Sequence, residues 1–121
     1  MTEKLKSKDF QERVFDYQKE NQWKFKGKIP AIIDFYADWC GPCQMVAPVL
    51  ERISEKYKGK INVYKVNVDE EIELAHHFQI RSIPTMLFIP IDSKPIGKMG
   101  FMSEQQIEKS IQDDLLKSKK I

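Results

Sequence analysis

The sequence contains very little cysteine and histidine. Of its 121 residues only two are Cys, Cys40 and Cys43, and only two are His, His76 and His77. A zinc site needs about four ligands, and adjacent helical residues point in directions about 100° apart, so these two histidines are poorly placed to bind one ion. We therefore expect no metal and no multi-disulfide framework, and we interpret His76 and His77 as exposed residues of a helix.

Long apolar runs are also missing. No stretch approaches the length of a membrane-spanning helix, and residues 1–5 contain no apolar core of a signal peptide. We therefore expect a cytoplasmic protein with no membrane partner. A chain whose signal peptide had been replaced by Met would give the same sequence, so periplasmic residence stays open.

Neither sign of charge is in excess, since 20 Lys and Arg face 18 Asp and Glu, for a net charge of +2. Two clusters of basic residues lie near the ends of the chain. The clusters are Lys4, Lys6 and Lys8, and Lys117, Lys119 and Lys120. We interpret them as solvated, frayed termini, so we expect no nucleic-acid partner and a monomer.

The chain has no repeat, low-complexity tract or linker, so we predict a single domain over residues 1–121, with 1–6 and 118–121 frayed. Apolar periodicity and turn residues predict the order β-α-β-α-β-α-β-β-α. The expected strands are 31–36, 61–68, 85–89 and 96–102, with 2–5 compatible with a short edge strand. The expected helices are 7–20, 40–57, a short one over 69–78 that is capped by Asp69 and carries Ile72, and one that begins with a capping box from Ser103 to Gln106. Helical crossovers followed by a late hairpin predict an α/β fold with a mixed five-stranded sheet and four helices.

The two cysteines lie where a buried strand gives way to a helix. A C-x-x-C pair at such a junction brings its sulfurs within bonding reach, and the helix N-terminus favours the thiolate of the first. A disulfide here would close too short a loop to stabilise the fold much, so we predict redox chemistry. Cys40, expected to be exposed, attacks a substrate disulfide, and Cys43, expected to be more buried, resolves the mixed disulfide. Gly41 and Pro42 fix how closely the sulfurs approach, and Pro suits the first turn of a helix.

Three further positions bear on the chemistry. Asp34 is a lone carboxylate in an apolar strand, so burial should raise its pKa and allow it to exchange a proton with Cys43; the alternative is a silent, structural acid. Lys65 is a candidate partner of Asp34 or an ordinary surface lysine. Pro84 precedes a strand, where a cis peptide bond is possible, but spacing alone does not predict one.

Together these residues resemble the thioredoxin family. The resemblance covers about residues 7–116 and rests on Trp39-Cys40-Gly41-Pro42-Cys43, Asp34, Pro48, Lys65 and Ile83-Pro84-Thr85. It implies the thioredoxin fold, with Cys40 as nucleophile, Cys43 as resolving thiol, Asp34 as proton-transfer group assisted by Lys65, and Pro84 as a cis-proline facing the disulfide. It also implies a substrate-binding surface formed by Trp39, Gly41, Pro42, Ile83, Gly100 and Phe101.

The resemblance implies a protein-disulfide reductase that needs no cofactor beyond its own disulfide. Its partners would be disulfide-containing proteins and an NADPH-dependent thioredoxin reductase. The Gly-Pro pair favours the reducing direction, because oxidising relatives usually carry His between the cysteines. Two alternatives remain: an exported disulfide oxidase or isomerase, and a non-catalytic binding module on the same fold.

Three residues near the cysteines depart from the family pattern or alter the local charge. Tyr36 stands where the family usually has Trp, and Gln44 stands where Lys is commoner. Gln44 removes a cation and Asp38 adds an anion near Cys40, and both changes slightly disfavour a thiolate.

Overall fold

The computed structural model describes residues 1–116 of the chain, so the expectations for Lys117, Lys119, Lys120 and the frayed end at 118–121 lie outside the described residues. The strands are β1 (Glu3–Lys4), β2 (Ala31–Tyr36), β3 (Asn62–Asn67), β4 (Thr85–Ile89) and β5 (Ile96–Met99). The helices are α1 (Ser7–Arg13), α2 (Gly41–Lys56), α3 (Ile72–His77) and α4 (Glu104–Ser110), the last continued by a π-helical turn, Ile111–Leu115.

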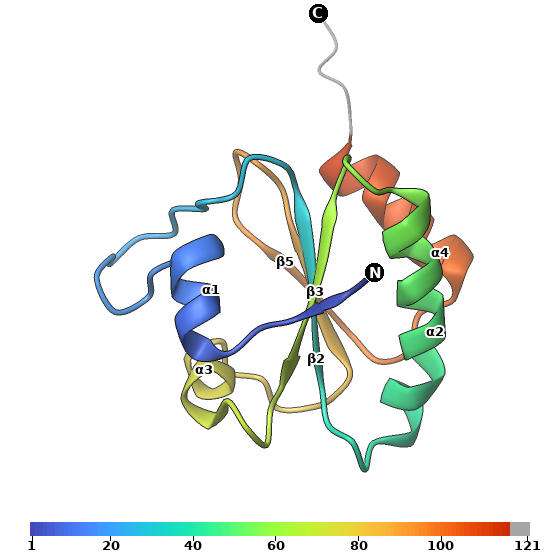
Figure 1. Cartoon of the computed structure of the whole chain (residues 1–121), viewed down its shortest axis with the longest axis horizontal. Coiled ribbons are helices and arrows are strands. Elements are labelled where there is room, and N and C mark those ends of the chain that lie inside the picture. Colours follow the sequence, from blue (N-terminus) through green and yellow to red (C-terminus); the bar gives the residue numbers. More distant parts are fainter. Residues whose placement is uncertain (117–121) are drawn as a thin grey trace, which may run out of the picture.

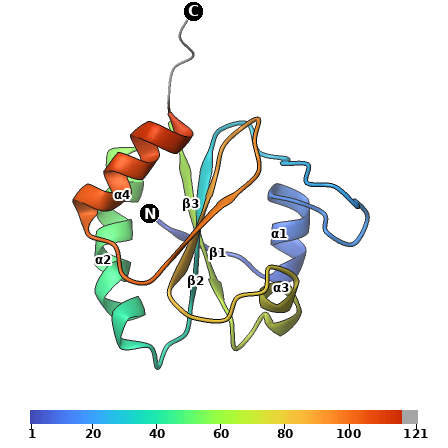
Figure 2. The same ribbon diagram turned by 180° about the vertical axis from the view of Figure 1, so that it is seen from behind.

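The strands form one mixed sheet in the order β1-β3-β2-β4-β5. β3 pairs in parallel with both β1 and β2, whereas β4 runs antiparallel to β2 and to β5. In Figures 1 and 2 the helices α1 and α3 cover one face of the sheet, and α2 and α4 cover the other. The predicted mixed five-stranded sheet flanked by four helices is confirmed.

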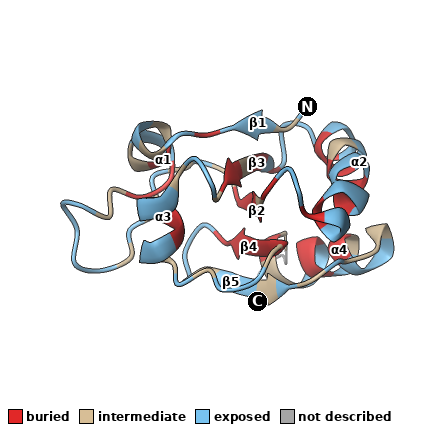
Figure 3. Cartoon of the chain, turned by 90° about the horizontal axis from the view of Figure 1, so that it is seen from below, coloured by how far each residue is buried: buried red, intermediate tan, exposed pale blue. Residues whose placement is uncertain are grey.

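The central strand β2 is buried on both faces, as its nearly unbroken apolar sequence predicts. Figure 3 shows the buried residues concentrated in the middle of the sheet and on the inner sides of the helices. On the side of α2 and α4, Ile32 packs with Met86 and Phe88; on the other side, Ile33 and Phe35 pack with residues of α1 and α3. This packing holds the carboxyl end of β2 firmly, and the next few residues carry the chain to the cysteines.

The expected capping box at the start of α4 is present. The Ser103 hydroxyl accepts a hydrogen bond from the Gln106 amide at 3.2 Å, and the Gln106 side chain accepts one from the Ser103 amide at 2.9 Å. Ser103→Ala is expected to lower the free energy of unfolding by about 1 kcal/mol, because an amide loses its partner. Urea unfolding would measure this. Ser93→Ala, at an exposed loop position, is the matched control, and an equal loss in both variants would contradict the assignment.

The N-terminus differs from the frayed segment expected at residues 1–6. Glu3 and Lys4 pair with Tyr64 and Lys65 of β3, and Leu5 is fully buried. The buried apolar side chain and the free edge of β3 explain the difference, because both stabilise an added strand. The alternative prediction of a short edge strand is the one that holds.

Two helix boundaries also differ from prediction. The first helix ends at Arg13, not near residue 20, and Tyr17 reaches the same aromatic cluster as Phe10 from the irregular segment that follows. The helical spacing of these residues therefore reflects a shared cluster, not a continuous helix. α3 begins after Glu71, with no side-chain cap from Asp69, and Ile72 is 70 % exposed.

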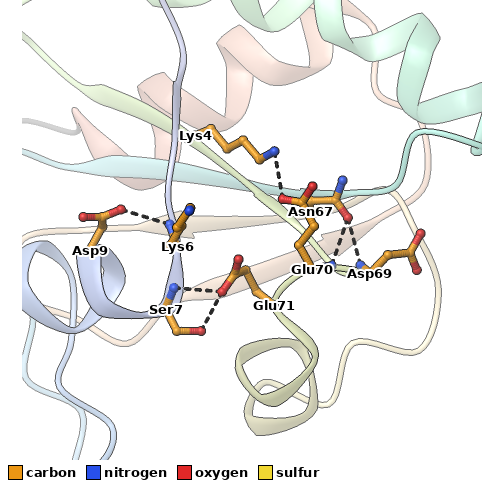
Figure 4. Close-up of polar contacts among 8 residues, drawn as sticks. All are labelled: Lys4, Lys6, Ser7, Asp9, Asn67, Asp69, Glu70 and Glu71. Carbon is orange, nitrogen blue, oxygen red and sulfur yellow. Dashed lines mark hydrogen bonds and ion pairs between the residues drawn. The ribbon is translucent and has the colours of Figure 1, made fainter.

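The junction of β1 and α1 is tied to the loop that joins β3 to α3 (Figure 4). Lys4 forms an ion pair with Glu70 at 2.8 Å, and Glu71 accepts hydrogen bonds from the amide and hydroxyl of Ser7. Within the loop, the Asn67 side chain accepts hydrogen bonds from the amides of Asp69 and Glu70. These contacts position Asp69, whose carboxylate accepts a hydrogen bond from Trp39, the residue before Cys40.

Over residues 1–116, no helix combines the length and the apolar character required to cross a membrane.

Candidate active site

The cysteines occupy the first turn of α2, directly after the loop that leaves β2; Figure 1 shows this turn at the lower edge of the molecule. Cys40 has an extended backbone and acts as the N-cap, and its sulfur accepts a hydrogen bond from the Cys43 amide at 3.2 Å. Pro42 fits here because the first helical amides have no partner within the helix, so its missing N–H costs nothing. The sequence thus places the sulfur of Cys40 at the positive end of a 16-residue helix.

Cys40 and Cys43 form a disulfide, with their Cα atoms 5.2 Å apart. The expectation that Cys40 is exposed is wrong for this oxidised state, because Cys40 is only 4 % exposed; Cys43 is buried as expected, at 3 % exposed. Ala37 packs against both cysteines, and Ile83 and Val68 cover the cluster. The cysteines still differ in position, because the Cys40 sulfur lies 3.8 Å from the Ile83 carbonyl oxygen. A disulfide sulfur has no hydrogen to donate, so this is a van der Waals contact.

The segment that faces the disulfide precedes β4. The Ile83–Pro84 peptide bond is cis, as the resemblance implied. The Pro84 carbonyl accepts a hydrogen bond from the Gly100 amide at 2.8 Å, and Gly100 has φ +89°, a conformation that glycine adopts without a steric clash. The Thr85 hydroxyl also donates to the Ser82 carbonyl at 2.6 Å. These bonds hold the backbone of residues 82–85 against the disulfide.

The remaining residues of the predicted substrate-binding surface differ in their exposure and in their contacts. Trp39 is 71 % exposed, and its indole N–H donates to the Asp69 carboxylate at 2.8 Å. Gly41 and Pro42 are exposed beside the disulfide. Phe101 is 44 % exposed and lines a separate hollow between β5 and α4. Sequence reasoning missed the role of Asp69, because nothing in the spacing of residues 39 and 69 indicates that they meet.

The Trp39 to Asp69 hydrogen bond can be tested with Trp39 as the single fluorophore. In a Trp23→Phe background, Asp69→Ala is expected to lower the fluorescence anisotropy of Trp39. The same change should raise KM for insulin disulfides about fivefold, equivalent to about 1 kcal/mol for a lost hydrogen bond to a charged group in a solvent-exposed setting. Asp69→Asn keeps an acceptor oxygen and is the matched control. Unchanged anisotropy in Asp69→Ala would contradict the prediction.

Asp34 lies on β2, opposite Lys65 of β3 and Met86 of β4. It is 3 % exposed, and within the described residues its Oδ1 atom has no hydrogen-bond partner. Burial raises the pKa of this carboxyl to about 7, and the charge of Lys65 opposes the rise. Among the described residues, Asp34 and Lys65 form no ion pair with each other. Asp34 is therefore able to hold or release a proton near neutral pH.

A groove connects Asp34 to Cys43. Its volume is about 280 Å³, and both Asp34 and Cys43 line it, together with Gln44 and Ala47 of α2. The groove has room for several water molecules, each of which takes about 30 Å³ in the liquid. A proton can thus pass between the carboxyl and Cys43 through water. Two of the residues that line the groove are bonded to each other, since the side-chain amide of Gln44 donates to the Asp38 backbone carbonyl at 2.7 Å.

The histidines take no part in this centre. His76 and His77 are exposed on α3, and His77 lies against the ring of Tyr17, 4.7 Å between centroids. Within residues 1–116, no group of three or more His, Cys, Asp and Glu side chains is placed to hold a metal ion.

The comparisons with known proteins agree with this geometry. The Thioredoxin family model matches residues 2–113. The chain is 47 % identical over 109 residues to a thioredoxin of Borreliella burgdorferi, covering 90 % of this chain and 93 % of that one. It is 40 % identical over 95 residues to a thioredoxin of Alicyclobacillus acidocaldarius, covering 78 % and 90 %.

The fold is also similar to a solved structure. The crystal structure of chloroplastic thioredoxin z superimposes with a TM-score of 0.77, at 28 % identity, covering 91 % of this chain and 90 % of that one. Members of this family act on disulfide substrates and are reduced by thioredoxin reductase. With its redox-active cysteine pair, the chain belongs to the thioredoxin family and is a thiol-disulfide oxidoreductase.

Proposed function

We propose that this protein reduces disulfide bonds of other proteins in a reducing compartment, the cytoplasm, and is recharged by an NADPH-dependent thioredoxin reductase. One observation carries the proposal: a disulfide at the N-terminus of α2 lies between the backbone edge at Ile83 and a groove that leads to Asp34. The edge gives a substrate a place to bind, and the carboxyl gives the reaction a proton acceptor.

The first step forms a bond to the substrate. In the reduced protein the Cys40 thiolate attacks one sulfur of the substrate disulfide, so that a Cys40–substrate disulfide forms and the substrate's other sulfur leaves as a thiolate, which takes a proton from water. The N-terminus of α2 and the Cys43 amide stabilise the negative charge on Cys40 before the attack.

The second step releases the substrate. The Cys43 thiol passes its proton through the groove to the Asp34 carboxylate, and the resulting thiolate attacks the Cys40 sulfur. The Cys40–Cys43 disulfide forms, and the second substrate sulfur leaves and takes a proton. Two electrons have moved to the substrate, and the reductase returns two electrons from NADPH.

The substrate binds in an extended conformation along residues 82–84. An extended peptide can hydrogen-bond the backbone there as an added strand, with Ile83 as an apolar contact. Trp39 on one side and Gly100 on the other would bound this surface. Phe101 is a weaker candidate, because it lines a different hollow.

Two alternative functions use the same fold. An oxidase or isomerase would use the same cysteines in the opposite direction, but the Gly41-Pro42 pair favours the reductase. A binding module would use the apolar rim alone, yet the buried acid and the cysteine pair would then have no use.

The decisive experiment uses Cys43→Ser as a trap. Without the resolving thiol, the Cys40–substrate disulfide cannot be released, so substrate proteins from a reducing-compartment lysate are expected to remain bound through a bond that dithiothreitol cleaves. Mass spectrometry identifies the captured proteins and the cysteines that were linked.

The Cys40→Ser, Cys43→Ser double variant is the control. Proteins retained by it bind without covalent chemistry and would support the binding module. Capture by neither variant would contradict the reductase assignment, and loss of insulin reduction in the double variant would support it.

A further inference from the structure

Tyr36, the last residue of β2, lies beside the groove that joins Asp34 to Cys43. It is half-buried and lines the groove together with Lys65. The Lys65 Nζ atom lies over the Tyr36 ring, 5.7 Å from its centroid. A cation at this distance from an aromatic face is attracted by the electrons of the ring. The ring is thus a binding position for the Lys65 ammonium inside the groove.

Two carboxylates compete with the ring for this ammonium. Asp34 stands directly opposite Lys65 in the sheet register, and Glu51 of α2 also interacts electrostatically with it. Glu51 already accepts hydrogen bonds from the amide and hydroxyl of Thr2. Asp34 has an oxygen with no hydrogen-bond partner among the described residues. Even so, within residues 1–116 Lys65 forms no ion pair with Asp34 or with Glu51. The Lys65 ammonium therefore lies over the Tyr36 ring and not in an ion pair with a carboxylate.

We propose that Tyr36 is a positioning residue: its ring holds the Lys65 ammonium beside, and not on, the Asp34 carboxylate, and so leaves that carboxylate free to exchange a proton with Cys43. This inference deepens the proposed function and rests on it. It also gives a role to a position where the chain departs from the Trp that is usual in the family.

Among the charged residues near Asp34, Lys65 is the one whose charge shifts its pKa. β4 contributes the uncharged Met86, α2 contributes Cys43 and Gln44 at the groove, and the loop after β2 contributes Asp38, which also lines the groove. Lys4 and Asp38 act electrostatically on Tyr36, whose hydroxyl also interacts with the Asn67 side chain. Burial raises the pKa of Asp34 to about 7 although Lys65 already lowers it, so a closer ammonium would lower that pKa further.

The test is the titration of Asp34 in the oxidised protein, followed by ¹³C NMR of its carboxyl carbon. Tyr36→Leu removes the ring and frees Lys65 to approach the carboxylate, so the midpoint of the titration is expected to fall by about one pH unit. Tyr36→Phe keeps the ring and is the matched control, with an expected midpoint close to that of the parent protein. The ring-current shift of the Lys65 methylene protons should persist in Tyr36→Phe and vanish in Tyr36→Leu.

A second background separates charge from solvent access. Leu is smaller than Tyr, so Tyr36→Leu also admits water, and this effect alone would persist in Lys65→Gln. The proposal requires the fall in midpoint to be much smaller in the Lys65→Gln background. An equal fall in both backgrounds, or no fall in the parent background, would overturn it. The oxidised protein needs neither substrate nor reductase for this measurement, so failure here leaves the trapping result, and hence the proposed function, untouched.

Discussion

Replacing Cys40 by Ser is expected to reduce the rate of insulin-disulfide reduction to the level seen without the protein. A serine hydroxyl is not ionised at neutral pH and forms no stable bond to sulfur, so the first step has no nucleophile. Cys43→Ser is expected to lose turnover as well, but to retain the first step. Both variants should therefore lose turnover, but only Cys43→Ser should capture a substrate as a mixed disulfide.

Burial alone would not predict this asymmetry, because the two cysteines are almost equally covered in the oxidised protein. The asymmetry comes from position. The Cys40 sulfur caps α2, accepts the Cys43 amide hydrogen and touches the backbone edge at Ile83, where a substrate is proposed to bind. Cys43 lines the groove on the inner side, where Asp34 lies.

The measurement uses the chromogenic disulfide 5,5′-dithiobis(2-nitrobenzoate). Reduced Cys43→Ser is expected to retain one thionitrobenzoate on Cys40, and this adduct should form quickly at pH 7. Reduced Cys40→Ser should react slowly, because its one thiol is buried and lacks the helix N-cap. Fast labelling of Cys40→Ser with slow labelling of Cys43→Ser would assign the nucleophile to Cys43 instead.

Much of this site could be predicted from sequence because it depends on local features. The apolar run before Asp34 predicts a buried strand and a raised pKa, and the Cys40-Gly41-Pro42-Cys43 junction predicts the helix start and the disulfide. The capping box at Ser103 is likewise a property of four neighbouring residues.

The features that were missed depend on contacts between distant segments. Cys40 is buried because Val68 and Ile83, from two other parts of the chain, cover it. Asp69 bonds Trp39 across 30 residues of sequence in place of capping α3. Whether the Lys65 ammonium lies over the Tyr36 ring or on the Asp34 carboxylate depends on the side-chain rotamer of Lys65, which residue spacing does not predict.

Asp34 is expected to make the oxidised protein less stable as the pH rises. The pKa of its carboxyl is about 7 in the folded protein, against an ordinary value of 3.8 in an unfolded chain. Between these values the folded protein keeps a proton that the unfolded chain has released, so raising the pH favours unfolding. The stability due to the neutral carboxyl is fully present below pH 3.8 and is lost as the pH rises through 7. At about 1.4 kcal/mol per pH unit, the loss is about 4 kcal/mol.

Asp34→Asn isolates this contribution, because an amide does not titrate. The free energy of unfolding of the variant minus that of the parent should rise by about 4 kcal/mol from about pH 4 to pH 8.5, measured by urea unfolding of the oxidised proteins. Asp113→Asn, at an exposed carboxyl, is the control and should change the difference little. A flat difference for Asp34→Asn would mean that Asp34 is ionised at neutral pH, and it would then be too weak a base for Cys43.

The same variant should slow release of the mixed disulfide about 100-fold at pH 7 while leaving its formation unchanged. A buried carboxyl that costs stability when it ionises is understandable if the ionised form is the base that accepts the Cys43 proton in the second step.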